Sequence, residues 1–393
     1  MPASAGRRPE FTYLDGIRGA AALIVVLYHA LLMTGHTGDP ARDMPLWFGV
    51  VVQGYLGVPI FIVLSGYVLM LPVAGTPGLR FRNGIWGFVK RRGRRILPPY
   101  WAALAIAVVL FATVPLLQVS HRTGWDSNLP VTPLDVVSHV LLLQDVNPSW
   151  FETIDGPLWS VAIEWQIYFV MAFALLPLWR RIPARWIVAV LLVFAVASSV
   201  SGSAAFLHPW FIALFAAGMW AAQLTVSTTR PALLKTAAVA GVVAIPVSYG
   251  LGFVLHLHNY GLTEIAVGIA LAAVLVLAGR FTLSHGTAPA LLRPFASRPM
   301  MFLGLISYSV YLLHVPLLAT ANLLLLPLGL STVPQYLVMT LVVAPVVLAL
   351  CWVFFLLVER HFLNSRQRHA SEELERHRET GAADSVPSPA MDA

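Results

Sequence analysis

The residues best suited to chemistry in this chain are a few charged and histidine side chains that interrupt long apolar stretches. A charge or an imidazole inside lipid is costly, so such a residue is a functional candidate by default and usually faces the interior of a helix bundle. Together these groups offer carboxylates and imidazoles that can move protons, and a guanidinium that can bind an anion. The candidates are Asp15, Arg18, His29, Glu164, Glu264, His314 and Glu359.

Arg18 and His29 stand eleven positions apart in the first apolar stretch. On a helix this spacing returns to within about 20° of the same azimuth after a rise of about 16 Å, so the two side chains share one face. His29 is then a candidate general base or nucleophile about halfway through the membrane, with Arg18 near the boundary. The structural alternative is that Arg18 pairs with Asp15 and that His29 only bonds a neighbouring helix.

A second polar face surrounds Glu164. Ser160, Glu164 and Tyr168 follow one another at intervals of four residues and therefore lie on the same side of a helix. A carboxylate in this position can orient His29 or bind the hydroxyl group of an acceptor. The alternative is a structural ion pair between Glu164 and an arginine of another helix.

A third polar face carries Ser307, Tyr311 and His314, at intervals of four and three residues. A polar stripe of this kind often joins neighbouring helices by hydrogen bonds, which is the structural interpretation. The functional prediction is that Tyr311 and His314 contact the substrate.

Five of the six residues from 90 to 95 are basic, namely Lys90, Arg91, Arg92, Arg94 and Arg95. Basic residues before an apolar stretch anchor a membrane protein to anionic lipid without any substrate. Arginine also binds phosphate oxygens in a fork geometry, so a phosphorylated substrate that approaches from the cytoplasm is the second interpretation.

These side chains are positioned by apolar stretches that recur from end to end of the chain. Hydrophobic residues make up 58% of the sequence and charged residues 11%, against about 25% charged in a soluble domain. We therefore predict an all-α fold, a polytopic transmembrane helix bundle of about ten helices, each long enough to cross the hydrocarbon core. The predicted spans are 14–34, 48–71, 96–117, 157–178, 186–201, 205–224, 233–254, 262–279, 301–326 and 335–358.

The basic residues give this bundle an orientation. Of 25 basic residues, 22 fall in segments that are cytoplasmic if the N-terminus is inside, whereas Arg42 and Arg122 fall outside. This distribution follows the positive-inside rule and predicts that both termini are cytoplasmic in a multi-pass protein of the inner (plasma) membrane. It also explains the net charge of +7 without nucleic acid. We expect one membrane domain over 1–360 and a polar, largely disordered tail over 361–393.

Five motifs in sequence resemble acyltransferase family 3, the bacterial integral membrane O-acyltransferases. The similarity runs in order from about residue 11 to residue 360, which is more specific than any single motif. The motifs are Leu14-Asp15-Gly16-Ile17-Arg18-Gly19 followed by Tyr28-His29, the segment from Gly57 to Tyr67, the arginines before Ile96, the segment from Pro157 to Glu164, and the segment from Ile306 to Pro316.

The resemblance implies transfer of an acyl group, with acetyl as the first expectation, from cytoplasmic acyl-CoA to a hydroxyl group of a saccharide, glycolipid or secondary metabolite. The family's arginine and catalytic histidine fall on Arg18 and His29. Many members have a second acidic residue after the glutamate of the fourth helix. This chain has Trp165 there, so the catalytic carboxylate is Glu164 alone. No metal and no permanently bound cofactor is expected.

The predicted mechanism uses arginines as a phosphate site for CoA. The family's paired arginines fall on Arg91 with Arg94 or on Arg92 with Arg95, because both spacings are present. The thioester then reaches His29, which acts as general base on the attacking hydroxyl group or as a nucleophile that forms an acyl-histidine. The other predicted substrate contacts come from Asp15, Arg18, Ser65, Tyr311 and His314, with Glu164 orienting the imidazole or the acceptor.

Two other function classes compete with this prediction. A transporter or flippase for a glycolipid or small polyol would use the same buried histidines and carboxylates. The sequence shows no repeat symmetry and no obvious pair of broken helices, which argues against that class. A glycosyltransferase that uses a lipid-linked sugar generally needs an acidic pair or a metal site facing the donor, and we find neither in the sequence.

The predicted orientation is testable by cysteine accessibility in a Cys351→Ala background. Single cysteines within 80–95 and 180–185 should react with a membrane-impermeant thiol reagent only from the cytoplasmic side, because these segments hold much of the positive charge. Labelling of cysteines within 118–135 from that same side would contradict the map.

Overall fold

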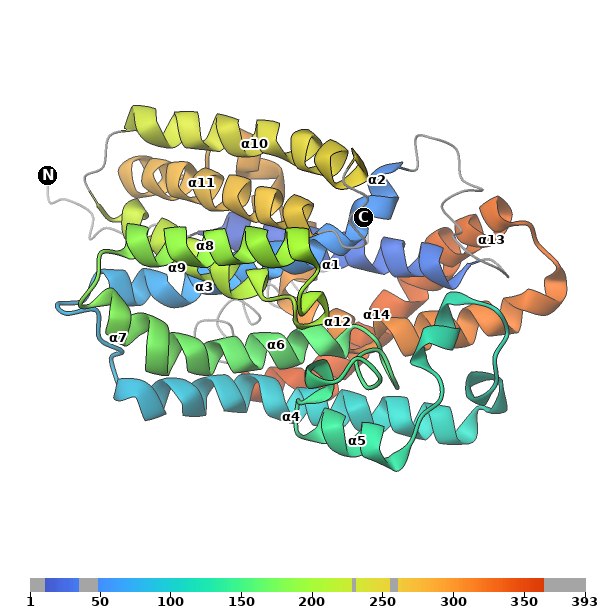
Figure 1. Ribbon diagram of the computed structural model, residues 1–393. Coiled ribbons are helices and arrows are strands. Elements are labelled where there is room, and N and C mark those ends of the chain that lie inside the picture. Colours follow the sequence, from blue (N-terminus) through green and yellow to red (C-terminus); the bar gives the residue numbers. More distant parts are fainter. Residues whose placement is uncertain (1–10, 35–48, 228–230, 255–260, 364–393) are drawn as a thin grey trace, which may run out of the picture.

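The computed structural model describes residues 11–34, 49–227, 231–254 and 261–363, and the regular elements within them are all helical. Figure 1 shows the long helices running side by side, with α10 at one edge of the view and α4 with the short α5 at the other. The helices are α1 (Thr12–Met33), α2 (Gly49–Val52), α3 (Gly57–Ala74), α4 (Gly84–Thr113), α5 (Pro133–Val140), α6 (Leu158–Phe169), α7 (Leu176–Trp179), α8 (Ala184–Ser201), α9 (Trp210–Thr225), α10 (Pro231–Val254), α11 (Gly261–His285), α12 (Arg298–Leu325), α13 (Thr332–Val338) and α14 (Ala344–Leu357).

The predicted membrane spans reappear in order as helices. Within the described residues, nine helical stretches are long and apolar enough to cross a membrane, and each coincides with a predicted span. The remaining prediction, 233–254, falls on α10, whose described apolar stretch Val239–Ser248 is shorter. Two of the nine contain a π-helical turn, because Val170–Leu175 joins α6 to α7 and Met339–Val343 joins α13 to α14. The predicted cytoplasmic termini lie outside the described residues.

The beginning of α4 differs from the prediction. The expected span began at 96, whereas α4 begins at Gly84 and continues to Thr113 with Pro98 and Pro99 inside it. Proline removes a helical hydrogen bond, but membrane helices tolerate it where neighbouring groups satisfy the freed carbonyls. The basic run therefore lies on the faces of a helix and not in the loop before it.

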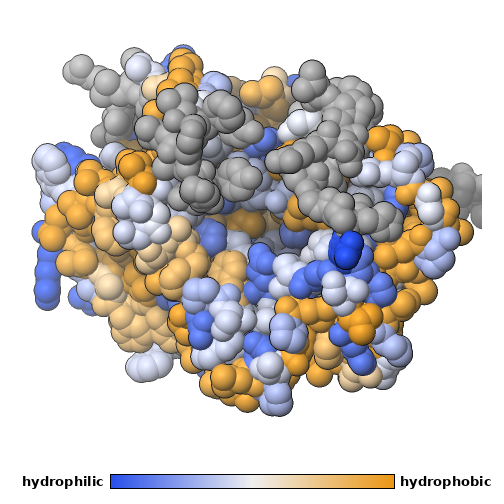
Figure 2. All heavy atoms as spheres, turned by 45° about the vertical axis from the view of Figure 1, so that its right-hand side comes forward, coloured by the Kyte–Doolittle hydropathy of each residue, from blue (hydrophilic) through white to orange (hydrophobic). Residues whose placement is uncertain are grey.

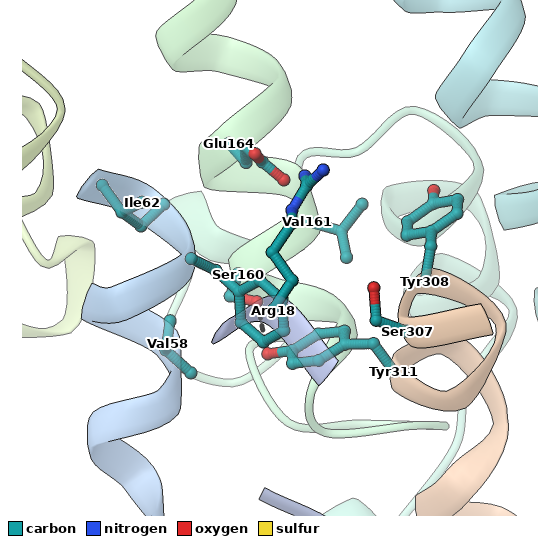
Figure 3. A pocket seen from close by; sticks show the side chains of 10 residues that line it. Arg18, Val58, Ile62, Ser160, Val161, Glu164, Ser307, Tyr308 and Tyr311 are labelled. Atoms are coloured by element: carbon teal, nitrogen blue, oxygen red, sulfur yellow. Dashed lines mark hydrogen bonds between the residues drawn. The ribbon is translucent and has the colours of Figure 1, made fainter. Parts of the chain in front are cut away.

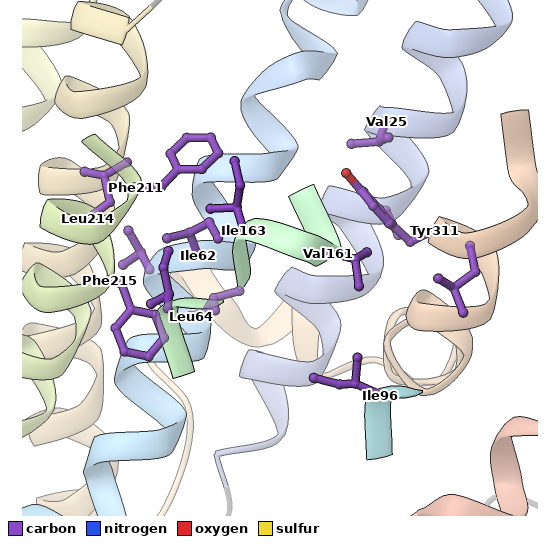
Figure 4. Close-up of a cluster of buried hydrophobic side chains, with 14 of the residues drawn as sticks. Val25, Ile62, Leu64, Ile96, Val161, Ile163, Phe211, Leu214, Phe215 and Tyr311 are labelled. Atoms are coloured by element: carbon purple, nitrogen blue, oxygen red, sulfur yellow. The ribbon is translucent and has the colours of Figure 1, made fainter. Parts of the chain in front are cut away.

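Apolar side chains lie both inside and outside this bundle. Figure 4 shows a buried cluster in which Ile62 of α3 packs against Phe211 and Phe215 of α9. On α8, Val193 is 71% exposed and Phe194 is 59% exposed. On the face shown in Figure 2, hydrophobic side chains cover both flanks and hydrophilic ones gather between them. Exposed apolar surface on this scale is expected of a protein whose solvent is lipid.

Two glycines let neighbouring helices approach until their backbones touch. A Cβ at Gly304 of α12 would lie 1.9 Å from the carbonyl oxygen of Asp15 in α1. A Cβ at Gly218 of α9 would lie 2.2 Å from the carbonyl oxygen of Val63 in α3. Small residues give membrane helices their close van der Waals contact. The approach of α1 to α12 matters most for function, because these helices carry the predicted histidines.

The segment 114–157 folds against α4. The Tyr100 hydroxyl group donates a hydrogen bond of 3.0 Å to the backbone carbonyl of His139. The Trp101 indole donates one of 3.0 Å to the carbonyl of Val140. Both acceptors lie at the end of α5, so these two bonds fix that short helix beside α4.

We expect Gly304→Ala to lower the apparent melting temperature of the purified protein in detergent. The added methyl group overlaps the backbone of α1, and overpacking of this kind costs about 1–3 kcal/mol. Gly250→Ala in α10 is the matched control, because a Cβ there meets nothing within 4 Å and alanine is the better helix former. Differential scanning fluorimetry measures both variants. A Gly304→Ala protein as stable as the wild type would contradict the close contact of α1 and α12.

Candidate functional site

A small cavity lies among α1, α3, α6 and α12. Its volume is ≈ 60 Å³, which is room for a few water molecules. Figure 3 shows polar side chains around it from three of these helices, and the fourth, α3, contributes apolar ones. The lining residues are Arg18, Val58, Phe61, Ile62, Ser160, Val161, Glu164, Ser307, Tyr308 and Tyr311. The cavity thus joins four of the five motifs singled out in the sequence.

The Glu164 carboxylate is held by two hydroxyl groups. Ser65 of α3 donates a hydrogen bond to its Oε1, and Tyr168 donates one of 2.6 Å to the same oxygen. The Arg18 guanidinium reaches toward this carboxylate in Figure 3. The ion pair found in the described part of this region joins Arg95 to a different carboxylate. Hydroxyl contacts therefore position Glu164, in place of the structural ion pair that was the alternative.

The basic run divides between two faces of α4. Arg92 and Arg95 are partly buried on the side of the bundle, whereas Arg91 and Arg94 are exposed. Arg92 also lies within electrostatic range of Arg18. Of the two arginine pairs that the sequence left open, one lies on the bundle side of α4 and the other is exposed.

Arg95 is engaged in an ion pair with the bundle. Its Nη1 lies 2.6 Å from Oε1 of Glu359, whose side chain has no exposed surface. The other oxygen of Glu359 accepts hydrogen bonds from the backbone N–H and the hydroxyl group of Ser309. Removing one partner of a buried ion pair costs about 3–5 kcal/mol, because the other charge stays buried. Arg92 is therefore the more available of the two inward arginines.

Arg18 brings an unsatisfied donor to the cavity. Its Nε is buried and has no hydrogen-bond partner among the described residues. With Arg92 and Arg95 it supplies three positive charges, against the two carboxylates of Glu164 and Glu359. An unsatisfied buried donor costs about 1–3 kcal/mol. A ligand oxygen that accepts a hydrogen bond from Arg18 removes this cost, and an anionic oxygen also balances the charge.

A hydrogen bond between His29 and His314 joins α1 to α12. The Nδ1 of His314 lies 3.0 Å from the carbonyl oxygens of Val310 and Tyr311, and since a carbonyl only accepts, this nitrogen carries the proton. The Nε2 of His314 therefore presents a lone pair to Nδ1 of His29, 3.2 Å away. That nitrogen of His29 also lies 2.9 Å from the carbonyl oxygen of Val25, so it too carries a proton.

This arrangement assigns the tautomer of His29 from its hydrogen bonds. With the proton on Nδ1, the neutral ring keeps a lone pair on Nε2. The hydrogen bonds that His29 forms with described residues all use Nδ1. A general base or nucleophile needs an oriented ring with one free nitrogen, and His29 has both.

Tyr311 connects the two histidines to the cavity. Its ring centroid lies 5.8 Å from that of His314, and its hydroxyl oxygen lies 2.5 Å from Oγ of Ser160. His29 shares a face of α1 with Arg18, as predicted, but it is not among the residues that line the cavity. Tyr311 contacts His314 and His314 contacts His29, so a chain of side-chain contacts links the cavity to the His29 ring.

Most predicted site residues therefore gather in one place. Asp15, Arg91 and Arg94 are the exceptions, because their side chains are exposed on the surface. Any contact of these three residues with a substrate would form outside the cavity. The predicted residues that line or adjoin the cavity are Arg18, His29, Ser65, Arg92, Arg95, Glu164, Tyr311 and His314.

Tyr308 is a cavity residue that the sequence did not indicate. Its hydroxyl group donates a hydrogen bond of 3.0 Å to the carbonyl of Ile96, which ties α12 to α4. The guanidinium of Arg95 lies 5.5 Å from the centroid of its ring. Tyr308 follows Ser307 and is turned about 100° from the stripe of Ser307, Tyr311 and His314. A prediction based on that stripe alone therefore omits Tyr308 from the site.

Comparison with known proteins adds an independent observation. The peptidoglycan O-acetyltransferase OatA of Listeria monocytogenes is 24% identical over 341 residues, which cover 78% of this chain and 49% of that protein. Protein 2 of the picA locus of Rhizobium radiobacter is 31% identical over 165 residues, which cover 41% of this chain and 77% of that protein. This chain thus spans about half the length of OatA. No solved structure matches it significantly.

The sequence profile of the acyltransferase domain of this family supports the resemblance over nearly the whole chain. It matches residues 11–356, which include the nine membrane-length helices of the described residues almost entirely. The match contains the cavity, the two histidines and the arginines of α4. This chain is a multi-pass membrane protein that belongs to acyltransferase family 3.

Proposed function

We propose that this chain transfers an acyl group, acetyl in the first instance, from cytoplasmic acyl-CoA to a hydroxyl group of a glycan, glycolipid or secondary metabolite. The observation that carries the proposal is Nε2 of His29, which has no hydrogen-bond partner among the described residues, whereas the other ring nitrogen is fixed by Val25 and His314. The name of OatA as a peptidoglycan O-acetyltransferase supports an acetyl donor and a glycan acceptor.

The arginines support a phosphorylated donor. Arg92 and Arg18 lie together beside the cavity with an excess of positive charge. Arginine suits the phosphate oxygens of CoA because its planar fork donates two parallel hydrogen bonds. The cavity of ≈ 60 Å³ is too small for the pantetheine arm, so side chains around it must move when the donor enters. With the phosphates at these arginines, the acyl end would then lie past Tyr311, toward His314 and His29.

The reaction requires two proton transfers, the first to His29 and the second from it. Nε2 of His29 accepts the proton of the acceptor hydroxyl group as its oxygen attacks the thioester carbonyl. The carbon–sulfur bond then breaks, and the imidazolium returns the proton to the leaving thiolate. His314 stabilises the imidazolium through its lone pair on Nε2, which accepts a hydrogen bond from Nδ1 of His29.

Donor binding is tested by Arg92→Ala, measured as CoA release from acetyl-CoA by the purified protein in detergent. The donor KM should rise by about tenfold or more, because charge-assisted contacts contribute about 1.5–3 kcal/mol each. Arg91→Ala is the matched control, since Arg91 is the exposed neighbour on the same helix. Equal donor KM values for the two variants would return the basic run to a role in membrane anchoring.

The role of His29 is tested by His29→Gln. Glutamine keeps a hydrogen bond but does not accept a proton at neutral pH, so turnover should fall to the background while expression and membrane insertion stay normal. His314→Gln is the control, because its side-chain oxygen can still accept from Nδ1 of His29, and it should retain part of the activity. His29 is not the base if His29→Gln keeps more than about a tenth of wild-type turnover. Such a result would mean that the activation barrier rises by less than about 1.4 kcal/mol.

A further inference from the structure

Asp155 carries a buried carboxyl group that the proposed mechanism does not use. It lies just before α6, and none of its surface is exposed. Neither of its side-chain oxygens has a hydrogen-bond partner among the described residues. An orphaned buried acceptor costs about 1–3 kcal/mol, and more when it is charged. A group of this kind in a folded protein calls for an explanation.

The backbone around Asp155 holds it in its buried position. Ile154 adopts a φ of 67°, a left-handed conformation that is rare for a β-branched residue and costs on the order of 1–3 kcal/mol. The side chain of Asn128 accepts a hydrogen bond of 2.8 Å from the backbone N–H of Gly156. The carbonyl of Asp155 accepts one of 3.1 Å from the N–H of Leu158. Strain next to an unpaired carboxyl group is a pattern of functional sites.

The neighbours of Asp155 connect it to the cavity. It interacts electrostatically with Tyr100 of α4 and with Tyr311 of α12. Tyr100 accepts a hydrogen bond from Gln144, whose side-chain oxygen is also buried without a partner among the described residues. Tyr311 lines the cavity and shares a hydrogen bond with Ser160. Asp155 therefore lies within electrostatic range of a residue that lines the cavity.

Burial removes water from the Asp155 carboxyl group, and no hydrogen bond from a described residue stabilises its ionised form. Removal from water raises the pKa of Asp155 well above its usual range. Asp126, in the same segment, shows the contrast. Partial burial acts to raise its pKa, but hydrogen bonds from the Ser120 hydroxyl group and from the N–H groups of His121 and Arg122 lower it overall. At Asp155 the neutral acid is the form that costs least.

We propose that Asp155 is carried as a neutral carboxylic acid and acts as a positioning residue for the hydroxyl groups of Tyr311 and Ser160. The proposal stands on its complete burial, its two oxygens without a partner among the described residues, the strained backbone beside it and its electrostatic interaction with Tyr311. Its effect on turnover rests on the acyl transfer proposed above, whereas its protonation state does not.

The hydroxyl groups of Tyr311 and Ser160 can share their hydrogens in two ways. In the first, Tyr311 donates to Ser160 at 2.5 Å, and Ser160 donates to the carbonyl of Pro157 at 3.2 Å. The oxygen of Tyr311 then keeps its lone pairs for an acceptor hydroxyl group in the cavity. In the second, an ionised Asp155 draws the hydrogen of Tyr311 toward itself, and Ser160 donates to Tyr311. A neutral Asp155 favours the first arrangement, because the hydrogen of its own carboxyl group can turn toward Tyr311 and disfavour a second donor there, which an apolar side chain cannot do.

The protonation state is measured by infrared spectroscopy of the purified protein in detergent at neutral pH. The wild-type spectrum minus that of Asp155→Asn should contain the carbonyl stretch of a protonated carboxyl group. The same subtraction with Asp126→Asn should not contain it, because the hydrogen bonds to Asp126 keep that group ionised. Absence of the band from the Asp155 difference spectrum would overturn the proposal.

The positioning role is measured as CoA release from acetyl-CoA. Asp155→Leu should lower kcat by about tenfold or more and leave the donor KM within about twofold, because the wall is disturbed and the arginines are not. Asp155→Asn, which stays neutral and polar, should keep most of the wild-type kcat. A normal kcat in Asp155→Leu would refute the positioning role.

The remaining outcomes are also decisive. If Asp155→Leu does not fold, Asp155→Asn decides instead, because a tenfold loss of kcat in that conservative variant would contradict a neutral acid. If the wild type itself releases no CoA from acetyl-CoA, the acyl transfer proposal fails. The infrared band then still decides whether Asp155 is protonated.

Discussion

The hydrogen bond from His29 to His314 is the contact on which the rest of the site depends. It crosses between α1 and α12, and it fixes which nitrogen of His29 carries the proton. The same two helices also touch at Gly304, where the α1 backbone occupies the place of a side chain. Inside a bundle no water replaces a lost partner, so the packing of the helices and the state of the imidazole are set together.

The buried polar groups around the cavity are satisfied unevenly. Glu359 and Glu164 each receive more than one partner, from an arginine or from hydroxyl groups. The Nε of Arg18 and the carboxyl group of Asp155 have none among the described residues. A fully satisfied polar network makes a structure rigid, and an unsatisfied one is costly. Hydrogen bonds or an ion pair therefore hold the two satisfied carboxylates in place, whereas Arg18 presents its N–H at the cavity and Asp155 stays buried away from it.

The sequence predicted the class of fold and most of the candidate site because lipid imposes strong rules. A buried charge such as Arg18 or Glu164 has few reasons to be in an apolar stretch, so its type alone indicated the site. The helical period also grouped Arg92 with Arg95. It did not show which face of α4 turns inward, because that depends on packing against α12. Asp155 is one of several acidic residues in the segment before α6, so its type alone did not set it apart. The positive φ of Ile154, which the sequence does not reveal, helps to bury it.

The length of α4 has a consequence for molecular recognition. Its 30 residues extend about 45 Å, whereas the hydrocarbon core is about 30 Å thick, so roughly a third of the helix has to stand outside the lipid. The exposed Arg91 and Arg94 then stand on a rigid helical projection and not on a flexible loop. A charged molecule that docks on such a projection does not have to order the chain first, which removes part of the entropic cost of association. Because α4 is continuous, the helix that binds a charged molecule at the surface also contacts Tyr308 in the interior of the bundle.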